Sequence, residues 1–109
     1  MNDHTINVAA DYSPTPLGRH SKHGNYSGQR FRDELLIPAL NKYDRLIIDF
    51  DGVAGLPSSF LEEAFGGLVR KRVITAQKFF SRVEIHATNP SLSLASDRIF
   101  RYMEAAGVN

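Results

Sequence analysis

The stretch DRLIIDFDGVAGLPSSFLEEAFGGLVRKR, residues 44–72, decides the architecture of this chain. Its aliphatic run at residues 46–48 has no polar alternation, which is typical of a strand covered on both faces. Gly52 and Gly55 then mark a tight turn. Residues 57–72 follow as the principal predicted helix. The stretch therefore predicts a buried strand, a turn and a helix in close succession.

Two adjacent apolar stripes support the helix at residues 57–72. Glu62 and Glu63 lie early in this helix and three basic residues lie at its end, an order that complements the helix dipole. The stripes consist of Phe60, Ala64 and Leu68, and of Leu61, Phe65 and Val69.

Towards the N-terminus, the pattern predicts a strand, a loop and a second helix. Residues 5–11 alternate apolar and polar side chains, as a half-buried strand does. Residues 18–28 contain three glycines and no apolar period, which indicates a loop. Ser27 is a competent helix N-cap, and Pro38 predicts a kink or an early end of the helix that follows it.

Towards the C-terminus, the sequence predicts one more strand and one more helix. Residues 73–78 form a connection that we leave unassigned, and residues 79–87 alternate as a strand does. Residues 91–106 show a helical apolar face, with Gly107 as the expected C-cap. Because strands alternate with helices, the chain is expected to form an α/β domain with right-handed crossovers.

Length and composition point to one ordinary globular domain spanning residues 1–109. The chain has 42% hydrophobic and 23% charged residues, and its formal charge of +1 gives no general signal for nucleic-acid binding. It has no cysteine, which excludes disulfides and thiolate metal sites. The N-terminus does not resemble a signal peptide, and the apolar runs are too short to cross a membrane. We therefore expect a cytoplasmic protein.

The run LIIDFDGV, residues 46–53, allows two interpretations. It looks like the first motif of haloacid-dehalogenase-type phosphatases, a resemblance that would make Asp49 a nucleophile and Asp51 a general acid. That chemistry also needs more carboxylates around a magnesium ion, and Asp97 is the one aspartate that follows Asp51. The interpretation that we favour is a turn in which both carboxylates accept hydrogen bonds from loop amides.

The serines at the start of the predicted helix also allow two interpretations. Ser59 and Glu62 fit the spacing of a capping box, so we expect Ser58 or Ser59 to cap the helix. A phosphate on either serine would lie at the positive end of the helix dipole, which favours a regulatory phosphorylation site. The two interpretations are compatible, because a cap hydroxyl already lies where a phosphate would be stabilised.

Two motifs together resemble a known domain family. A strand followed by D-x-x-x-V and then by S-S-x-L is similar to the STAS domain of anti-anti-sigma factors, and Ser59 aligns with the serine that a partner kinase phosphorylates there. Pro57 and Phe60 replace the aspartate and the glycine of that motif. The chain looks more closely like the bacterial STAS-like family of unknown function, through Gly18-Arg19, Ser27-Gly28-x-x-Phe31-Arg32, and the runs at residues 49–53 and 57–68.

This resemblance implies a fold and a class of function. The expected fold is a single compact STAS-like α/β domain, in which helices pack on a mixed central sheet. The expected function is that of a non-enzymatic bacterial regulatory module, with no catalytic residues, no metal and no cofactor. It would bind a protein through residues 51–68, and the partner that the resemblance implies is an anti-sigma-type kinase or another histidine-kinase-like ATPase. The candidate contact residues are Asp51, Phe60, Glu63, Gly66 and Gly67; the oligomeric state stays open.

Two further features, a glycine pair and a basic loop, each allow two interpretations. The Gly66-Gly67 pair indicates either close packing of the helix or a bare surface for a partner. The loop residues Arg19, His20, Lys22 and His23 indicate either a solvated basic loop or a site for phosphate or a nucleotide. The alternative function is accordingly a small phosphohydrolase, or a protein that binds a phosphate or nucleotide ligand, using Asp49, Asp51 and the loop at residues 19–23.

Overall fold

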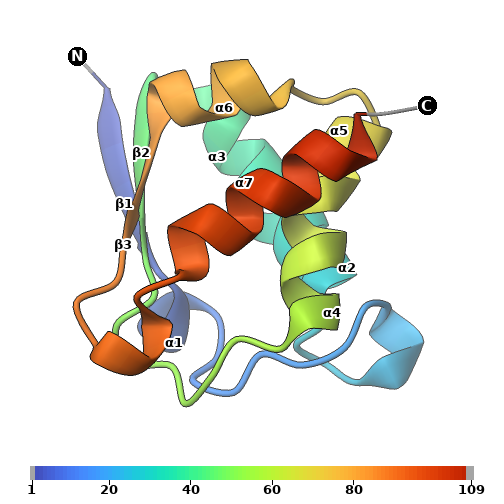
Figure 1. Cartoon of the computed structure of the whole chain (residues 1–109), viewed down its shortest axis with the longest axis vertical. Helices are drawn as coiled ribbons and strands as arrows, with labels where there is room; N and C mark the ends of the chain where they lie inside the picture. The colour runs from blue at the N-terminus through green and yellow to red at the C-terminus, as the bar shows by residue number, and fades with distance from the viewer. Residues whose placement is uncertain (1, 108–109) are drawn as a thin grey trace.

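The computed structural model describes residues 2–107 and shows three strands beside a layer of helices (Figure 1). The strands are β1 (Asp3–Asn7), β2 (Arg45–Asp49) and β3 (Val83–His86), and they form one sheet in the order β1-β2-β3. Both strand pairs are parallel. The expected α/β class is therefore confirmed, whereas the described strands form a parallel sheet and not a mixed one.

The helices cover one face of this sheet, and Figure 1 shows no helix on the other face. The order β1-β2-β3 never reverses, so two right-handed crossovers deliver their helices to the same side. Leu46 and Ile48 on the covered face are buried, whereas Ile47 between them is 36% exposed. The prediction that β2 is covered on both faces is therefore wrong, although β2 is the central strand.

Helical turns replace parts of two predicted strands. The strand expected at residues 5–11 ends at Asn7, because the Asn7 side chain accepts a hydrogen bond from the Ala10 amide (2.9 Å) and caps α1 (Val8–Asp11). The strand expected at residues 79–87 is restricted to β3. Thr75 accepts a hydrogen bond from the Lys78 amide (3.2 Å) and starts α6 (Ala76–Arg82) within the connection at residues 73–78.

Residues 28–42 form one uninterrupted helix, which we call the first helix. It consists of α2 (Gly28–Phe31), η2 (Arg32–Leu36) and α3 (Ile37–Lys42). Ser27 caps it, as expected, by accepting a hydrogen bond from the Arg30 amide (3.2 Å). Of the two outcomes predicted at Pro38, a kink or an early end, the early end is wrong. The η2 segment is a π-helical turn in which the Ile37 amide bonds to the Arg32 carbonyl, and this wider turn accommodates the proline that follows.

The second helix runs over residues 58–70, as α4 (Ser58–Leu61), the π-helical η3 (Glu62–Gly66) and α5 (Gly67–Arg70). It lies between the first helix and α7 (Ala95–Ala106), the last helix. Gly107 is the C-cap of α7, as predicted. The core between the sheet and these helices is rich in aromatic side chains: Phe31, Phe50, Phe60, Phe65 and Phe79 are fully buried.

Two short 3-10 turns complete the fold, η1 (Ser21–His23) and η4 (Pro90–Leu92). The η1 turn lies within the loop that was predicted at residues 18–28. None of the helices within residues 2–107 has the length and apolar character that crossing a bilayer requires.

Candidate functional site

The middle of the second helix faces the interior of the domain. Phe60, Gly66 and Gly67 are all buried by other parts of the chain, and a Cβ at Gly67 would collide with the guanidinium of Arg32. The glycines therefore allow close packing, one of the two interpretations of the sequence. The expectation that these three residues offer a surface to a partner is not compatible with the fold.

Glu63 is also committed to a contact within the chain. Its side chain accepts a hydrogen bond from Nη1 of Arg32 (2.6 Å), and its backbone carbonyl accepts another from the same nitrogen (2.9 Å). Asp33 accepts a hydrogen bond from Nε of Arg32 (3.0 Å). The Arg32 side chain is only 2% exposed, so the Arg32–Glu63 ion pair connects the first helix to the second inside the protein.

Glu62 on the outer side of the second helix joins two arginines that are far apart in the sequence. It forms ion pairs with Arg19 in the loop and with Arg70 at the end of the helix. Partial burial raises the pKa of Glu62, but the hydrogen bonds from Arg70 and Arg19 outweigh burial and leave it below its usual value. Glu62 therefore does not form the predicted capping box with Ser59.

The basic loop is attached to the body of the domain. Arg19 pairs with Glu62, and its carbonyl accepts a hydrogen bond from the Gln29 amide (2.8 Å). The side chains of His20 and His23 lie close together, with ring centroids 5.6 Å apart, and Lys22 is exposed. Since Arg19 already has an acidic partner, binding of an anion by this loop remains a prediction that the structure does not test.

The two serines at the start of the second helix do not cap it. The N-cap is Pro57, which offers no side-chain acceptor, and Ser58 and Ser59 form the first turn. The predicted capping role is therefore wrong, because the N-cap is Pro57, two residues before the Ser59 position that the capping box requires. The first-turn amides consequently have no side-chain cap.

Ser58 is exposed and has a cationic neighbour that the sequence did not suggest. Its Oγ lies 3.2 Å from Nη2 of Arg98 on α7, and the same nitrogen donates to the Leu56 carbonyl at 2.9 Å. Tyr102, one turn further along α7, belongs to the same cluster, because a hydrogen bond with Ser58 is the main cause that lowers the pKa of Tyr102. Ser59 is half-buried.

Exposed leucines occur on two segments that contact residues 54–59, which we call the serine turn. Leu17 is 60% exposed and shares a cavity of about 260 Å³ with Ala54 and Pro57. Leu94 is 59% exposed, and its carbonyl accepts the hydrogen bond from the Arg98 amide (2.9 Å). The serine turn therefore combines an accessible hydroxyl, a guanidinium and two exposed leucines.

Asp49 and Asp51 lie at the carboxyl end of β2 and bind nearby amides. Oδ1 of Asp49 accepts from the Asp51 amide (2.9 Å), and Oδ1 of Asp51 accepts from the amides of Thr88 (2.8 Å) and Asn89 (3.1 Å). Oδ2 of Asp51 accepts from the Thr88 hydroxyl at 2.6 Å, and this bond, followed by the one from Asn89, lowers the pKa of Asp51. The interpretation of both carboxylates as acceptors for loop amides is confirmed.

The same carboxylates lie near a histidine. Asp49, Asp51 and His86 each offer a ligand atom within 4.8 Å of the others, a spacing that a divalent cation could bridge. However, the loop at residues 19–23 lies beside α4 in Figure 1, away from the carboxyl ends of the strands near α1. The structure therefore does not assemble the composite phosphate site of the alternative function.

Comparison with known proteins identifies a family. Residues 27–92, more than half of the chain, match the family model described as a STAS-like domain of unknown function (DUF4325). The matched region contains the first and second helices, β2, β3 and the serine turn. No curated protein and no solved structure matches the chain.

Proposed function

Because the chain belongs to the STAS-like family of unknown function, we propose that it is a non-enzymatic cytoplasmic regulatory module that binds a protein partner through the serine turn. Phosphorylation of a serine in this turn would control that binding. The partner implied by the resemblance to anti-anti-sigma factors is a kinase or ATPase of the histidine-kinase-like type.

The observation that carries this proposal is the environment of Ser58. Its hydroxyl is exposed at the first turn of a long helix whose amides have no side-chain cap. Arg98 reaches the same hydroxyl. Free amides and a guanidinium are the groups that stabilise a phosphate, so the turn offers a favourable site for phosphoserine.

The exposed leucines indicate how the same turn would contact a protein. Leu17 and Leu94 present exposed apolar surface on segments that contact the serine turn, and apolar side chains near the centre of a contact supply much of its stability. A phosphate on Ser58 would bring a negative charge into this contact. The charge would have to lose water on association, which opposes binding.

The structure and the resemblance favour different serines within the turn. The resemblance aligns Ser59 with the phosphorylated serine, whereas the structure leaves Ser58 more accessible and places Arg98 beside it. Both serines must therefore be tested separately.

Phosphosite mapping tests the regulatory part of this proposal. The chain is expressed in its native host, purified under denaturing conditions with phosphatase inhibitors, and analysed by intact-mass and peptide mass spectrometry. We expect one added phosphate on Ser58 or Ser59, and its loss in the Ser58→Ala/Ser59→Ala variant. A chain that binds its partner reversibly in the host but carries no phosphate on either serine under any growth condition would contradict phosphorylation control.

A further inference from the structure

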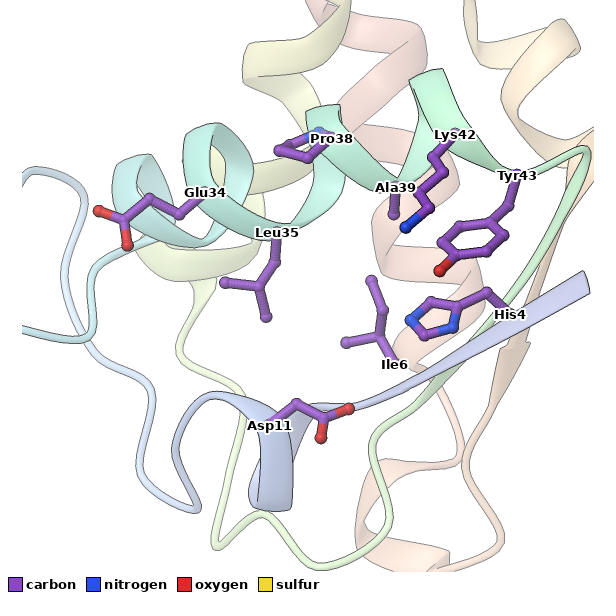
Figure 2. A pocket seen from close by; sticks show the side chains of 9 residues that line it. All are labelled: His4, Ile6, Asp11, Glu34, Leu35, Pro38, Ala39, Lys42 and Tyr43. Atoms are coloured by element: carbon purple, nitrogen blue, oxygen red, sulfur yellow. The ribbon is translucent and has the colours of Figure 1, made fainter.

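A groove runs between the edge strand β1 and the first helix (Figure 2). Its volume is about 410 Å³. Its lining residues come from β1, α1 and the first helix: His4, Ile6, Asp11, Glu34, Leu35, Pro38, Ala39, Lys42 and Tyr43.

The groove has an apolar middle and ends of opposite charge. Figure 2 shows Ile6 and Leu35 pointing into its middle, with Asp11 and Glu34 towards one end. Lys42 lies towards the other end, where the ring of His4 stacks on the ring of Tyr43 at a centroid distance of 4.3 Å. The long axis of the groove therefore has an acidic end and a basic end.

β1 is an edge strand, so no other strand of the sheet pairs with the edge of β1 that faces away from β2. The Asn2 carbonyl accepts a hydrogen bond from the Arg45 amide of β2 (3.3 Å), whereas the Asn7 amide bonds to the Asp11 side chain (2.8 Å) and not to β2. Successive residues of a strand direct their amides and carbonyls to opposite edges, so Asp3 and Thr5 direct theirs outwards. Such an edge can pair with another strand.

We propose that the occupant of this groove is a second copy of the chain, whose β1 pairs antiparallel with the first β1 about a twofold axis near Thr5. A twofold axis perpendicular to the sheet reverses the groove, so the acidic end of one copy meets the basic end of the other. Pro38 lies midway between Glu34 and Lys42 in the sequence, so these two side chains exchange places about the axis.

This self-complementarity favours a second copy over an unrelated peptide. A contact between identical surfaces places a charge opposite another charge of the same set, and Glu34 and Lys42 form such an opposite pair on either side of an apolar centre. The pairing would join two three-stranded sheets into one continuous sheet of six strands. It would leave the serine turn free, because that turn lies at the carboxyl ends of the strands.

Sedimentation velocity at low ionic strength tests the dimer. We expect wild type to sediment as a species of twice the 12.2 kDa chain mass, and each single reversal, Glu34→Lys or Lys42→Glu, to weaken dimerisation by about tenfold or more. The double reversal should restore it, because the opposite charges again meet. Asp97→Lys, an exposed change on α7, is the control and should leave the dimer intact.

A cross-link provides a second measurement that does not depend on the charge reversals. Because the chain has no cysteine, Thr5→Cys introduces a single thiol on an exposed strand residue. A short bismaleimide should join two Thr5→Cys chains and should not join two Ser81→Cys chains, whose thiols lie on α6. A monomer at all concentrations up to millimolar, a dimer that neither reversal weakens, or equal cross-linking of both cysteine variants would overturn the proposal.

Discussion

The guanidinium of Arg32 occupies the space that a side chain at Gly67 would need. A Cβ built on Gly67 would collide with Nη1 of Arg32 and lie 3.2 Å from its Cδ. The first and second helices therefore approach closely with a buried cation between them, and Glu63 neutralises that cation. This contact holds the first helix against the second helix, whose first turn contains Ser58 and Ser59.

Replacing Gly67 with alanine should destabilise the protein. Alanine is the better helix former, but its methyl group would displace Arg32 from its hydrogen bonds with Glu63. We expect a loss of about 1–3 kcal/mol in the free energy of unfolding, the range for overpacked interiors. Gly55→Ala is the matched control, because a Cβ there meets nothing within 4 Å. Urea unfolding measures both, and equal stability of the two variants would contradict the contact.

Removing one partner of the Arg32–Glu63 pair should cost more than the pair itself contributes. Glu63→Gln removes the carboxylate from Nη1 of the buried Arg32, which keeps Asp33 at its Nε. Arg32→Met removes the nearest cation from Glu63, which keeps Arg70 at 3.5 Å. Each single change should cost about 3–5 kcal/mol. The double variant should be less destabilised than the sum of the two, which a double-mutant cycle measures. Additive effects would show that the two side chains do not interact.

Acid should weaken the contact that Glu62 makes with Arg19 and Arg70. Burial raises the pKa of Glu62, but the two arginines leave it below the usual glutamate value. A depressed pKa contributes stability that is complete above the unfolded-state value of about 4.3 and is lost as the pH falls through the folded-state value. Glu62→Gln should therefore lose stability at pH 7 and show a smaller further loss between pH 5 and pH 3 than wild type. Parallel pH curves would rule out this role.

Asp51→Asn should loosen the loop after β3. The carboxylate accepts three hydrogen bonds from Thr88 and Asn89, and an asparagine can accept with only one oxygen. We expect faster hydrogen exchange at the amides of Thr88 and Asn89, with no change in the amides of the second helix. Unchanged exchange at residues 88–89 would show that Asp51 does not hold this loop, and a catalytic role of Asp51 would then have to be tested. In that case, magnesium-dependent hydrolysis of a phosphate ester should be measured.

The strand–turn–helix unit could be predicted from the sequence because its signals are local. The aliphatic run gave β2, and the two apolar stripes gave the helix at residues 58–70 within two residues at either end. The same run could not show that Ile47 is exposed, because the number of covered faces depends on the strand order. The strand order depends on contacts between distant segments.

The errors at the site have the same origin. Ser59 and Glu62 have the spacing of a capping box, but Glu62 binds Arg19, which is 43 residues away, and Arg70. No local pattern indicates the contact of Arg98 with Ser58, 40 residues away. The burial of Arg32 did leave a signal, because Arg32 shares a helical stripe with Leu36 and Leu40.

The most direct test of the central claim measures partner capture by serine variants. Wild type, the alanine and aspartate variants at Ser58 and Ser59, and the control Ser81→Asp on α6 are used as baits in lysate of the native host, with circular dichroism to verify the fold. We predict that quantitative mass spectrometry finds one partner with wild type, both alanine variants and Ser81→Asp. Ser58→Asp or Ser59→Asp should reduce its capture by about tenfold. Equal capture of that partner by all six baits would contradict a regulatory role for the serine turn.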